Sequence, residues 1–191
     1  MARPRTVSDD AILDAAMDLM HRSGPGALTY AAVGKAVGLS PATLVQRYPS
    51  KEAFLRATLM RAWDGLDALT AAADREEPVT VEGAIAMLVR MFPTGTGETD
   101  YAEGLLILRE DMRDPVLRAR GTAWGEVLAL ALGRRLTQDW VEQMRLGRLM
   151  ASQWQGAQIW WAFSRRGDPA VVIAQELRDW CAAVQEPKTR R

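Results

Sequence analysis

Apolar residues recur every three or four positions through most of the chain, which is the spacing of a helix face that packs on a core. The first such face consists of Ile12, Ala16, Leu19 and Met20. Ser8 precedes it as an N-cap, and Asp9 and Asp10 fall in the first turn, where negative charge is favourable. No segment shows the alternation typical of a strand, so we predict an all-α protein.

Capping residues, glycines and prolines divide this pattern into separate helices. The expected helices cover residues 9–22, 30–37, 41–47, 51–73, 80–91, 99–112, 115–135, 138–166 and 169–185. Residues 93–97 contain two glycines and a proline, so we expect a loop there. The helix over 138–166 is apolar on two sides, which indicates that both sides are buried. One side could face the subunit's own core and the other, together with helix 169–185, a partner subunit.

Residues 29–48 combine a short helix, a turn that contains glycine and a second short helix, which is the arrangement of a helix-turn-helix. The interface between the two helices is expected to consist of Val33, Val37, Leu39 and Leu44. The side chains left free to meet base edges are those of Ala42, Thr43, Gln46 and Arg47. A plain pair of capped helices that binds no DNA is the alternative interpretation.

The chemistry of these side chains suits DNA. Glutamine can bond adenine, arginine can bond guanine, and the threonine methyl can contact thymine. Tyr30, Ser40 and Lys51 are the expected phosphate partners. The predicted DNA-binding set is therefore Tyr30, Ser40, Pro41, Ala42, Thr43, Gln46, Arg47 and Lys51.

The formal net charge of zero argues against nucleic-acid binding, because phosphate neutralisation usually leaves a basic signature. Residues 1–56 carry seven basic and five acidic side chains, so this segment is only weakly positive. DNA affinity must therefore come from a few placed contacts rather than from a broad basic field.

A longer run of residues is more specific than the helix-turn-helix alone. It consists of Ile12, Leu19, Gly24, Leu28-Thr29, Val33, Val37 to Leu44 and Tyr48 to Leu55. This order resembles the N-terminal signature of the TetR family of transcriptional regulators. The resemblance implies a three-helix DNA-binding domain at residues 1–50 and a larger helical ligand-binding and dimerisation domain at 51–191, with residues 51–73 as a connector.

The resemblance also implies a homodimer that binds a roughly palindromic DNA operator. Such a protein typically represses a nearby gene and is released by a small-molecule effector. Val45 departs from the family pattern, since many members have an aromatic residue, often a phosphate-contacting tyrosine, after the leucine of the recognition helix. Gln46, Arg47 and Tyr30 could compensate for it.

Several aromatic residues of the C-terminal half are candidates for binding the effector, because their rings can stack on a flat or cationic molecule. The expected ligand-binding residues are Trp124, Trp154, Gln158, Trp161 and Tyr101. Each tryptophan could instead pack in the core, which is the commoner role of buried aromatic residues.

Little in the sequence favours an enzyme. His21 and Cys181 are the sole histidine and cysteine and lie far apart, so neither a metal cluster nor a catalytic triad is expected, and we expect no cofactor. The longest uncharged stretch, residues 149–164, is too short to span a membrane, and we expect a cytoplasmic protein. The alternative function is a dimeric helical small-molecule-binding or interaction protein whose head no longer binds DNA.

Overall fold

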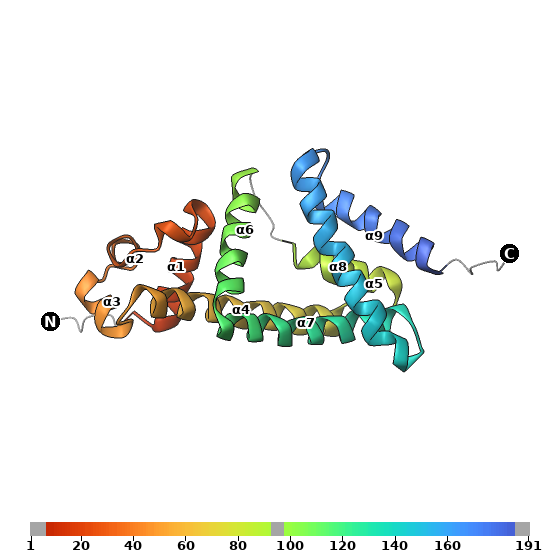
Figure 1. Ribbon diagram of the computed structural model, residues 1–191, viewed down its shortest axis with the longest axis horizontal. Helices are drawn as coiled ribbons and strands as arrows, with labels where there is room; N and C mark the ends of the chain where they lie inside the picture. Colours follow the sequence, from red (N-terminus) through yellow and green to blue (C-terminus); the bar gives the residue numbers. More distant parts are fainter. Residues whose placement is uncertain (1–6, 93–97, 186–191) are drawn as a thin grey trace. The chain divides into compact units, whose positions relative to one another are not determined.

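The computed structural model describes residues 7–92 and 98–185, and within these ranges the chain is helical with no strand. Figure 1 shows the helices in chain order. They are α1 (Asp9–Ser23), η1 (Pro25–Ala27), α2 (Tyr30–Val37), α3 (Pro41–Arg47), α4 (Lys51–Glu76), α5 (Val81–Arg90), α6 (Glu98–Arg113), α7 (Pro115–Leu136), α8 (Trp140–Ser164) and α9 (Pro169–Gln185). The predicted all-α fold is confirmed. The expected loop at 93–97 lies outside the described residues.

The helix boundaries follow local capping chemistry. The hydroxyls of Ser8, Thr29 and Ser40 each accept a hydrogen bond from a backbone N–H three residues further on. Helix α4 runs three residues past the predicted end at Ala73, because no glycine or proline lies between Ala73 and Pro78. The short 3-10 turn η1 was not predicted.

The chain divides into two compact units, which we call the head unit (residues 1–65 and 96–121) and the body unit (66–95 and 122–191). Helices α4 and α7 each contribute residues to both units. Helix α6 belongs to the head unit and packs against α1. The predicted division into a DNA-binding domain at 1–50 and a ligand-binding and dimerisation domain at 51–191 stays a prediction.

The head unit is built on one apolar cluster that joins α1, α2, α3 and the first turns of α4. Phe54 lies at its centre and is 1% exposed. The Phe54 ring stacks on Tyr30 and Tyr48, with ring centroids 5.5 and 4.6 Å apart. The wider cluster includes Ile12, Leu13, Ala16, Met20, Leu28, Val33, Leu44, Leu59, Ile107 and Leu117. This packing fixes the helix-turn-helix on α1 and α4.

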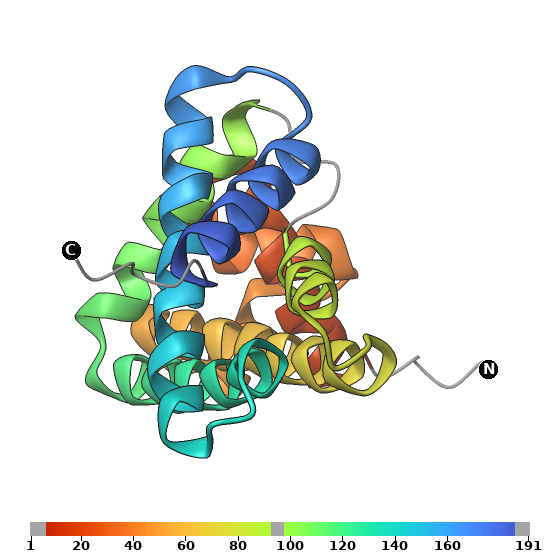
Figure 2. The same ribbon diagram turned by 90° about the vertical axis from the view of Figure 1, so that its right-hand side faces the viewer.

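In the body unit, α9 packs against both α8 and α5, as the end-on view in Figure 2 shows. Two glycines bring α7 and α8 into backbone contact. A Cβ atom on Gly147 would collide with the carbonyl oxygen of Ala129, and one on Gly133 would collide with that of Gln143. The buried residues of this unit include Ile85, Met87, Leu88, Leu128, Leu132, Met150, Ile173 and Leu177.

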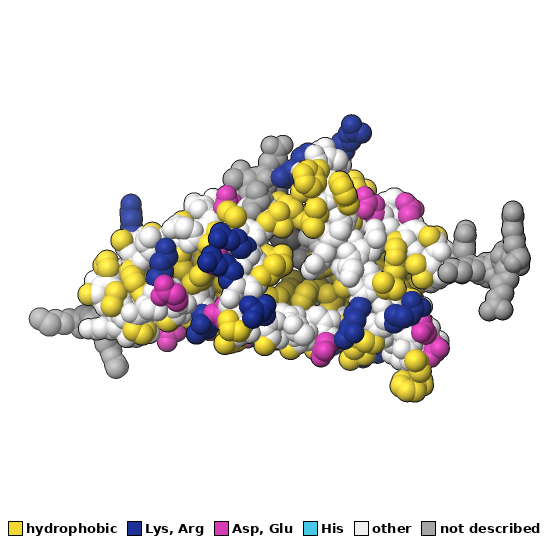
Figure 3. Space-filling view, in the orientation of Figure 1, with side chains coloured by type: hydrophobic (Ala, Val, Ile, Leu, Met, Phe, Trp, Pro, Cys, Tyr) yellow, Lys and Arg dark blue, Asp and Glu magenta, His cyan; other side chains and the backbone are white. Residues whose placement is uncertain are grey.

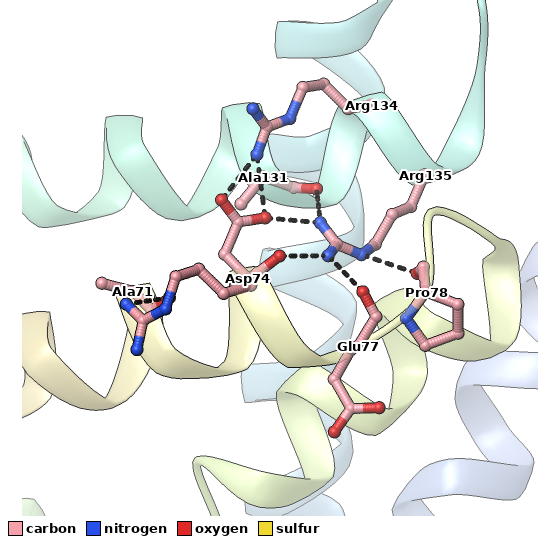
Figure 4. Close-up of polar contacts among 8 residues, drawn as sticks. Ala71, Asp74, Glu77, Pro78, Ala131, Arg134 and Arg135 are labelled. Carbon is pink, nitrogen blue, oxygen red and sulfur yellow. Dashed lines mark hydrogen bonds and ion pairs between the residues drawn. The ribbon is translucent and has the colours of Figure 1, made fainter.

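A buried arginine fixes the end of α4 within the body unit. The Arg135 guanidinium donates to the carbonyl oxygens of Asp74, Glu77, Pro78 and Ala131 and to the Asp74 carboxylate (Figure 4). These bonds occupy all five N–H groups of the arginine. The carbonyls of Asp74 and Glu77 come from the end of α4, where the helix dipole is negative and a cation is favourable.

Candidate nucleic-acid interface and ligand site

The two helices of the helix-turn-helix are in close contact. Val33 of α2 and Leu44 of α3 are both 0% exposed, and Val37 and Leu39 pack around them. A Cβ atom on Gly34 would lie 2.6 Å from the Leu39 carbonyl oxygen, so only glycine lets the turn fold back this tightly. The sequence interpretation missed Gly34, because a glycine inside a helix does not by itself reveal a close approach.

The outer face of α3 carries four exposed residues: Pro41, Ala42, Val45 and Gln46. Val45 is 44% exposed, so the aliphatic side chain that replaces the usual aromatic residue lies on this face. Thr43 is half-buried, and its hydroxyl lies 2.8 Å from that of Ser40. Gln46 is therefore the hydrogen-bonding side chain that α3 presents most openly.

Tyr30 is held inside the head unit. Its hydroxyl donates to the Tyr48 carbonyl oxygen at 2.7 Å, and its ring stacks on Phe54. A phosphate oxygen needs a donor, and this O–H is already used. The predicted phosphate contact of Tyr30 would therefore require the bond to Tyr48 to break.

Arg47 ends α3 and points toward the start of α1 rather than away from the protein. Its Nη1 donates to the Val7 carbonyl oxygen at 2.9 Å and to the Asp9 carboxylate at 3.0 Å. The Arg47 side chain is 29% exposed. Burial and the nearby Asp9 carboxylate raise the pKa of the adjacent Tyr48 phenol above its usual 10.0. The base-reading role predicted for Arg47 competes with these contacts.

Lys51 opens α4 on the surface next to α3. Ser50 caps this helix by accepting from the Ala53 N–H at 3.1 Å. The neighbouring Glu52 is exposed, and hydrogen bonds from its own backbone and from Ser50 hold the pKa of its carboxyl below the usual value. This negative charge partly offsets Lys51. On the face drawn in Figure 3, the described Lys and Arg side chains do not form one continuous patch over the head.

The head matches a known family of DNA-binding proteins. Residues 12–58 match the model of the tetR family of bacterial regulatory proteins, a range that includes α2, α3 and most of α1. The head of the chain therefore carries a DNA-binding domain of the TetR type. Its helix-turn-helix is therefore the DNA-binding element of that family, as the sequence predicted.

The likeness to a solved structure extends through the body unit. One matching crystal structure comes from Saccharomonospora viridis, is assigned as a transcriptional regulator and was solved in complex with choline. It is 19% identical, with a TM-score of 0.71 over 90% of this chain and 93% of that chain. A comparison with curated proteins gave no match.

The predicted ligand residues fall in different parts of the fold. Trp124, Trp154, Trp161 and Gln158 belong to the body unit, whereas Tyr101 of α6 belongs to the head unit. The three tryptophans are 6–7% exposed. The Trp124 Nε1 donates to the Thr70 hydroxyl at 2.9 Å, and the Trp161 Nε1 donates to the Gly167 carbonyl at 3.2 Å.

Trp154 differs from the other two. Its Nε1 is buried and has no hydrogen-bond partner among the described residues. Gln158, one turn further along α8, uses its amide to donate to the Trp154 carbonyl at 3.3 Å. A buried N–H without an acceptor costs free energy.

Helices α8 and α9 carry large apolar side chains at the surface. Trp160 is 68% exposed, Phe163 78% and Val171 67%, and the rings of Trp160 and Phe163 lie 5.9 Å apart. An open groove of about 420 Å³ follows the first half of α8 and is lined by Val141, Met144, Arg145, Arg148, Leu149 and Ser152.

Metal-ligating side chains are scattered over the part of the chain that the structure describes. Among these residues, no group of three or more such side chains is assembled. In the same ranges, no helix is both long and apolar enough to cross a membrane.

Proposed function

We propose that this protein is a ligand-responsive repressor of the TetR type that binds a roughly palindromic operator as a homodimer. The observation that carries the proposal is the exposed face of α3 in a helix-turn-helix that matches the family model. We infer that Gln46 on this face bonds adenine and that Lys51 at the start of α4 contacts a phosphate.

Dimerisation is supported by the apolar surface of α8 and α9. Exposed Trp160, Phe163 and Val171 would be costly on a monomer, and burying them between two subunits would form a four-helix interface. A dimer with two heads can contact two half-sites about one helical turn apart. The neutral net charge makes this second head important, because each head alone has little electrostatic attraction to DNA.

A cationic or aromatic effector is supported by the tryptophans of the body unit. The Arg165 guanidinium lies 5.0 Å above the Trp161 ring, so this ring already accepts a cation on its face. The related structure from Saccharomonospora viridis contains choline, a quaternary ammonium compound. The Trp154 N–H would add a hydrogen bond to an effector oxygen.

Release from DNA would follow from the continuity of α4. This helix begins next to α3 and ends at the Arg135 anchor in the body unit. An effector that shifts this end would change the separation of the two heads in a dimer, and the two half-sites could no longer be contacted together.

A titration of the full-length protein tests this function. The protein first selects its preferred duplex from a random DNA library. This duplex is then labelled, and its fluorescence anisotropy is measured as protein is added, at several salt concentrations and with and without choline. Salt-sensitive, sequence-preferring binding supports the repressor function, and weakening of this binding by choline supports a quaternary ammonium effector. If no sequence is enriched, the repressor function is wrong.

The second candidate is a dimeric ligand-binding protein whose head no longer binds DNA. It is favoured by the neutral net charge and by the exposed Val45. The same titration separates the two candidates, because this protein would bind its ligand while showing only weak binding to every duplex.

A further inference from the structure

The recognition helix α3 is joined to the core of the head by very little apolar surface. Of its seven residues, all within the described part of the chain, Leu44 alone is buried and belongs to the apolar cluster of the head unit. Four of the others are exposed. A single apolar anchor fixes where a short helix lies but not how it is turned about that point. The orientation of α3 therefore depends on the contacts at its two ends.

The N-terminal end of α3 is held by the turn that leads into it. This turn is so tight that a Cβ atom on Gly34 would lie 2.6 Å from the Leu39 carbonyl oxygen. Ser40 caps the helix by accepting from the Thr43 N–H at 3.1 Å. These contacts lie within the helix-turn-helix itself, so they define where α3 begins but leave its far end to other partners.

The C-terminal end of α3 is joined to α1 by Arg47. Its Nη1 donates to the Val7 carbonyl oxygen at 2.9 Å and to the carboxylate of Asp9, the first residue of α1, at 3.0 Å. The residue after the helix is held as well, because the Tyr30 hydroxyl donates to the Tyr48 carbonyl oxygen at 2.7 Å. The far end of α3 thus has one link to α1 and one to α2.

We propose that Asp9 and Arg47 are positioning residues for DNA recognition, and that the contact between them sets the orientation of α3 and thereby the base pair that Gln46 reads. The inference rests on the proposed DNA-binding function, and it gives Arg47 a role other than base reading. The Asp9 carboxylate repels phosphates, which fits a positioning role better than a DNA contact.

The dimensions of α3 make base recognition sensitive to this contact. Seven helical residues span about 10 Å, so a shift of about 1 Å at one end tilts the helix by about 6°. Gln46 is next to Arg47 and moves by nearly the same distance. A functional side chain must be held within about 0.5 Å of its productive geometry. Loss of the Arg47 contact is therefore sufficient to change base recognition while the head stays folded.

Positioning and mere structural support predict different results. The Asp9 side chain is 67% exposed and that of Arg47 29%, and exposed ion pairs contribute little to stability. A purely structural contact, once removed, lowers the folded fraction and weakens binding to every duplex by one common factor. Loss of positioning instead changes the ratio of affinities between duplexes, which we call the discrimination.

The test uses the full-length protein, the duplex that it selects from a random DNA library, and single-base variants of that duplex. Q46A should reduce the discrimination at one base pair of each half-site. R47A should reduce it by roughly fivefold or more at the same base pair and also at a neighbouring one, because the whole helix shifts. The effects of R47A and Q46A at the shared base pair should not add. Circular dichroism and the thermal midpoint establish that each variant is folded.

The variant D9A separates positioning from base reading by Arg47. It removes the partner and leaves the guanidinium in place, so we expect D9A to reduce the discrimination at the same base pairs as R47A. Its matched control is D10A. Asp10 lies in the same first turn of α1, has a side chain that is 68% exposed and pairs with Arg61 of α4 rather than with α3. D10A changes the net charge equally and should leave the discrimination unchanged.

Three results would overturn the inference while leaving the proposed function intact. The first is a D9A protein that binds the selected duplex more tightly with unchanged discrimination, because this would show that Asp9 competes with DNA for Arg47. The second is an R47A protein that binds all duplexes more weakly by one factor, which would show a structural role. The third is a D9A protein that behaves like D10A. If the wild type selects no sequence, the proposed function and this inference are both wrong.

Discussion

Arg135 and Asp74 form an ion pair of 2.6 Å in which the arginine side chain is fully buried and the aspartate side chain is 29% exposed. Arg134 pairs with the same carboxylate from the surface, where its own side chain is 52% exposed. The two arginines are adjacent in sequence and share one partner, yet only Arg135 also binds the carbonyls that end α4 (Figure 4).

This difference predicts unequal effects of removing each arginine. R135A should lower the free energy of unfolding by about 3–5 kcal/mol, because it leaves buried carbonyls and a carboxylate without their donors. R134A should cost less than about 1 kcal/mol, as is usual for an exposed ion pair. Urea unfolding followed by circular dichroism measures both values. Equal losses would show that the buried bonds of Arg135 add nothing.

The carboxyls of Asp74 and Asp111 should respond to pH in opposite directions. Burial opposes ionisation of Asp74, but hydrogen bonds from Arg135 and Arg134 outweigh it and hold its pKa below 3.8. Burial raises the pKa of Asp111 above 3.8, although the Trp63 indole donates to this carboxyl at 3.0 Å. Stability from Asp74 is therefore present above its unfolded pKa and lost as pH falls through the folded value, whereas stability from Asp111 is lost as pH rises.

The variant D111N isolates this second effect, because asparagine keeps an acceptor for Trp63 and cannot ionise. We expect D111N to gain stability relative to the wild type as pH rises from 3.8 through the folded pKa of Asp111. Urea unfolding at a series of pH values measures the difference. A constant difference between the two proteins would contradict the raised pKa.

Gln46 and Lys51 should affect DNA binding in different ways. Q46A should relax the base preference at one position of each half-site, at a cost of about 1–3 kcal/mol for the preferred base. K51A should weaken binding to all duplexes alike and lower the salt slope by about one for each phosphate that Lys51 neutralises. Anisotropy titrations against the selected duplex and its single-base variants measure both. Identical profiles for the two variants would contradict these roles.

The exposed apolar residues of α8 predict a variant that does not dimerise. W160E should convert the dimer to a monomer, because it places a charge in the centre of the proposed interface, where no partner charge is expected. Val127 of α7 is 57% exposed, and V127E serves as the matched control outside this surface. Sedimentation velocity reports the mass of each variant. A dimeric W160E would place the interface elsewhere.

The tryptophan indoles provide a matched pair for the effector site. W124F removes the hydrogen bond to Thr70 and should cost about 1 kcal/mol more than W154F, whose N–H has no partner to lose. W154F should in turn weaken effector binding if this N–H bonds the effector. Urea unfolding and calorimetric titration with choline test the two statements. Equal unfolding losses would show that the Thr70 bond contributes nothing net.

The sequence by itself determined the helices and the recognition motif. Caps such as Ser8, Thr29 and Ser40 act on N–H groups within three residues, and apolar periodicity is repeated within each helix, so both can be read from short stretches. The match of residues 12–58 to the tetR family agrees with that interpretation. The predicted end of α4 was three residues short, because the sequence offers no strong stop signal before Pro78.

Only the tertiary structure decided what the functional side chains contact. Arg47 meets Val7, which is 40 residues away, and the Tyr30 hydroxyl meets the Tyr48 carbonyl, 18 residues away. Arg134 and Arg135 are a further case, because nothing in the sequence shows that Arg135 is buried while Arg134 is exposed. Which hydrogen-bond partner a side chain has depends on how distant segments of the chain pack around a shared core. The spacing of apolar residues within one helix therefore does not predict that partner.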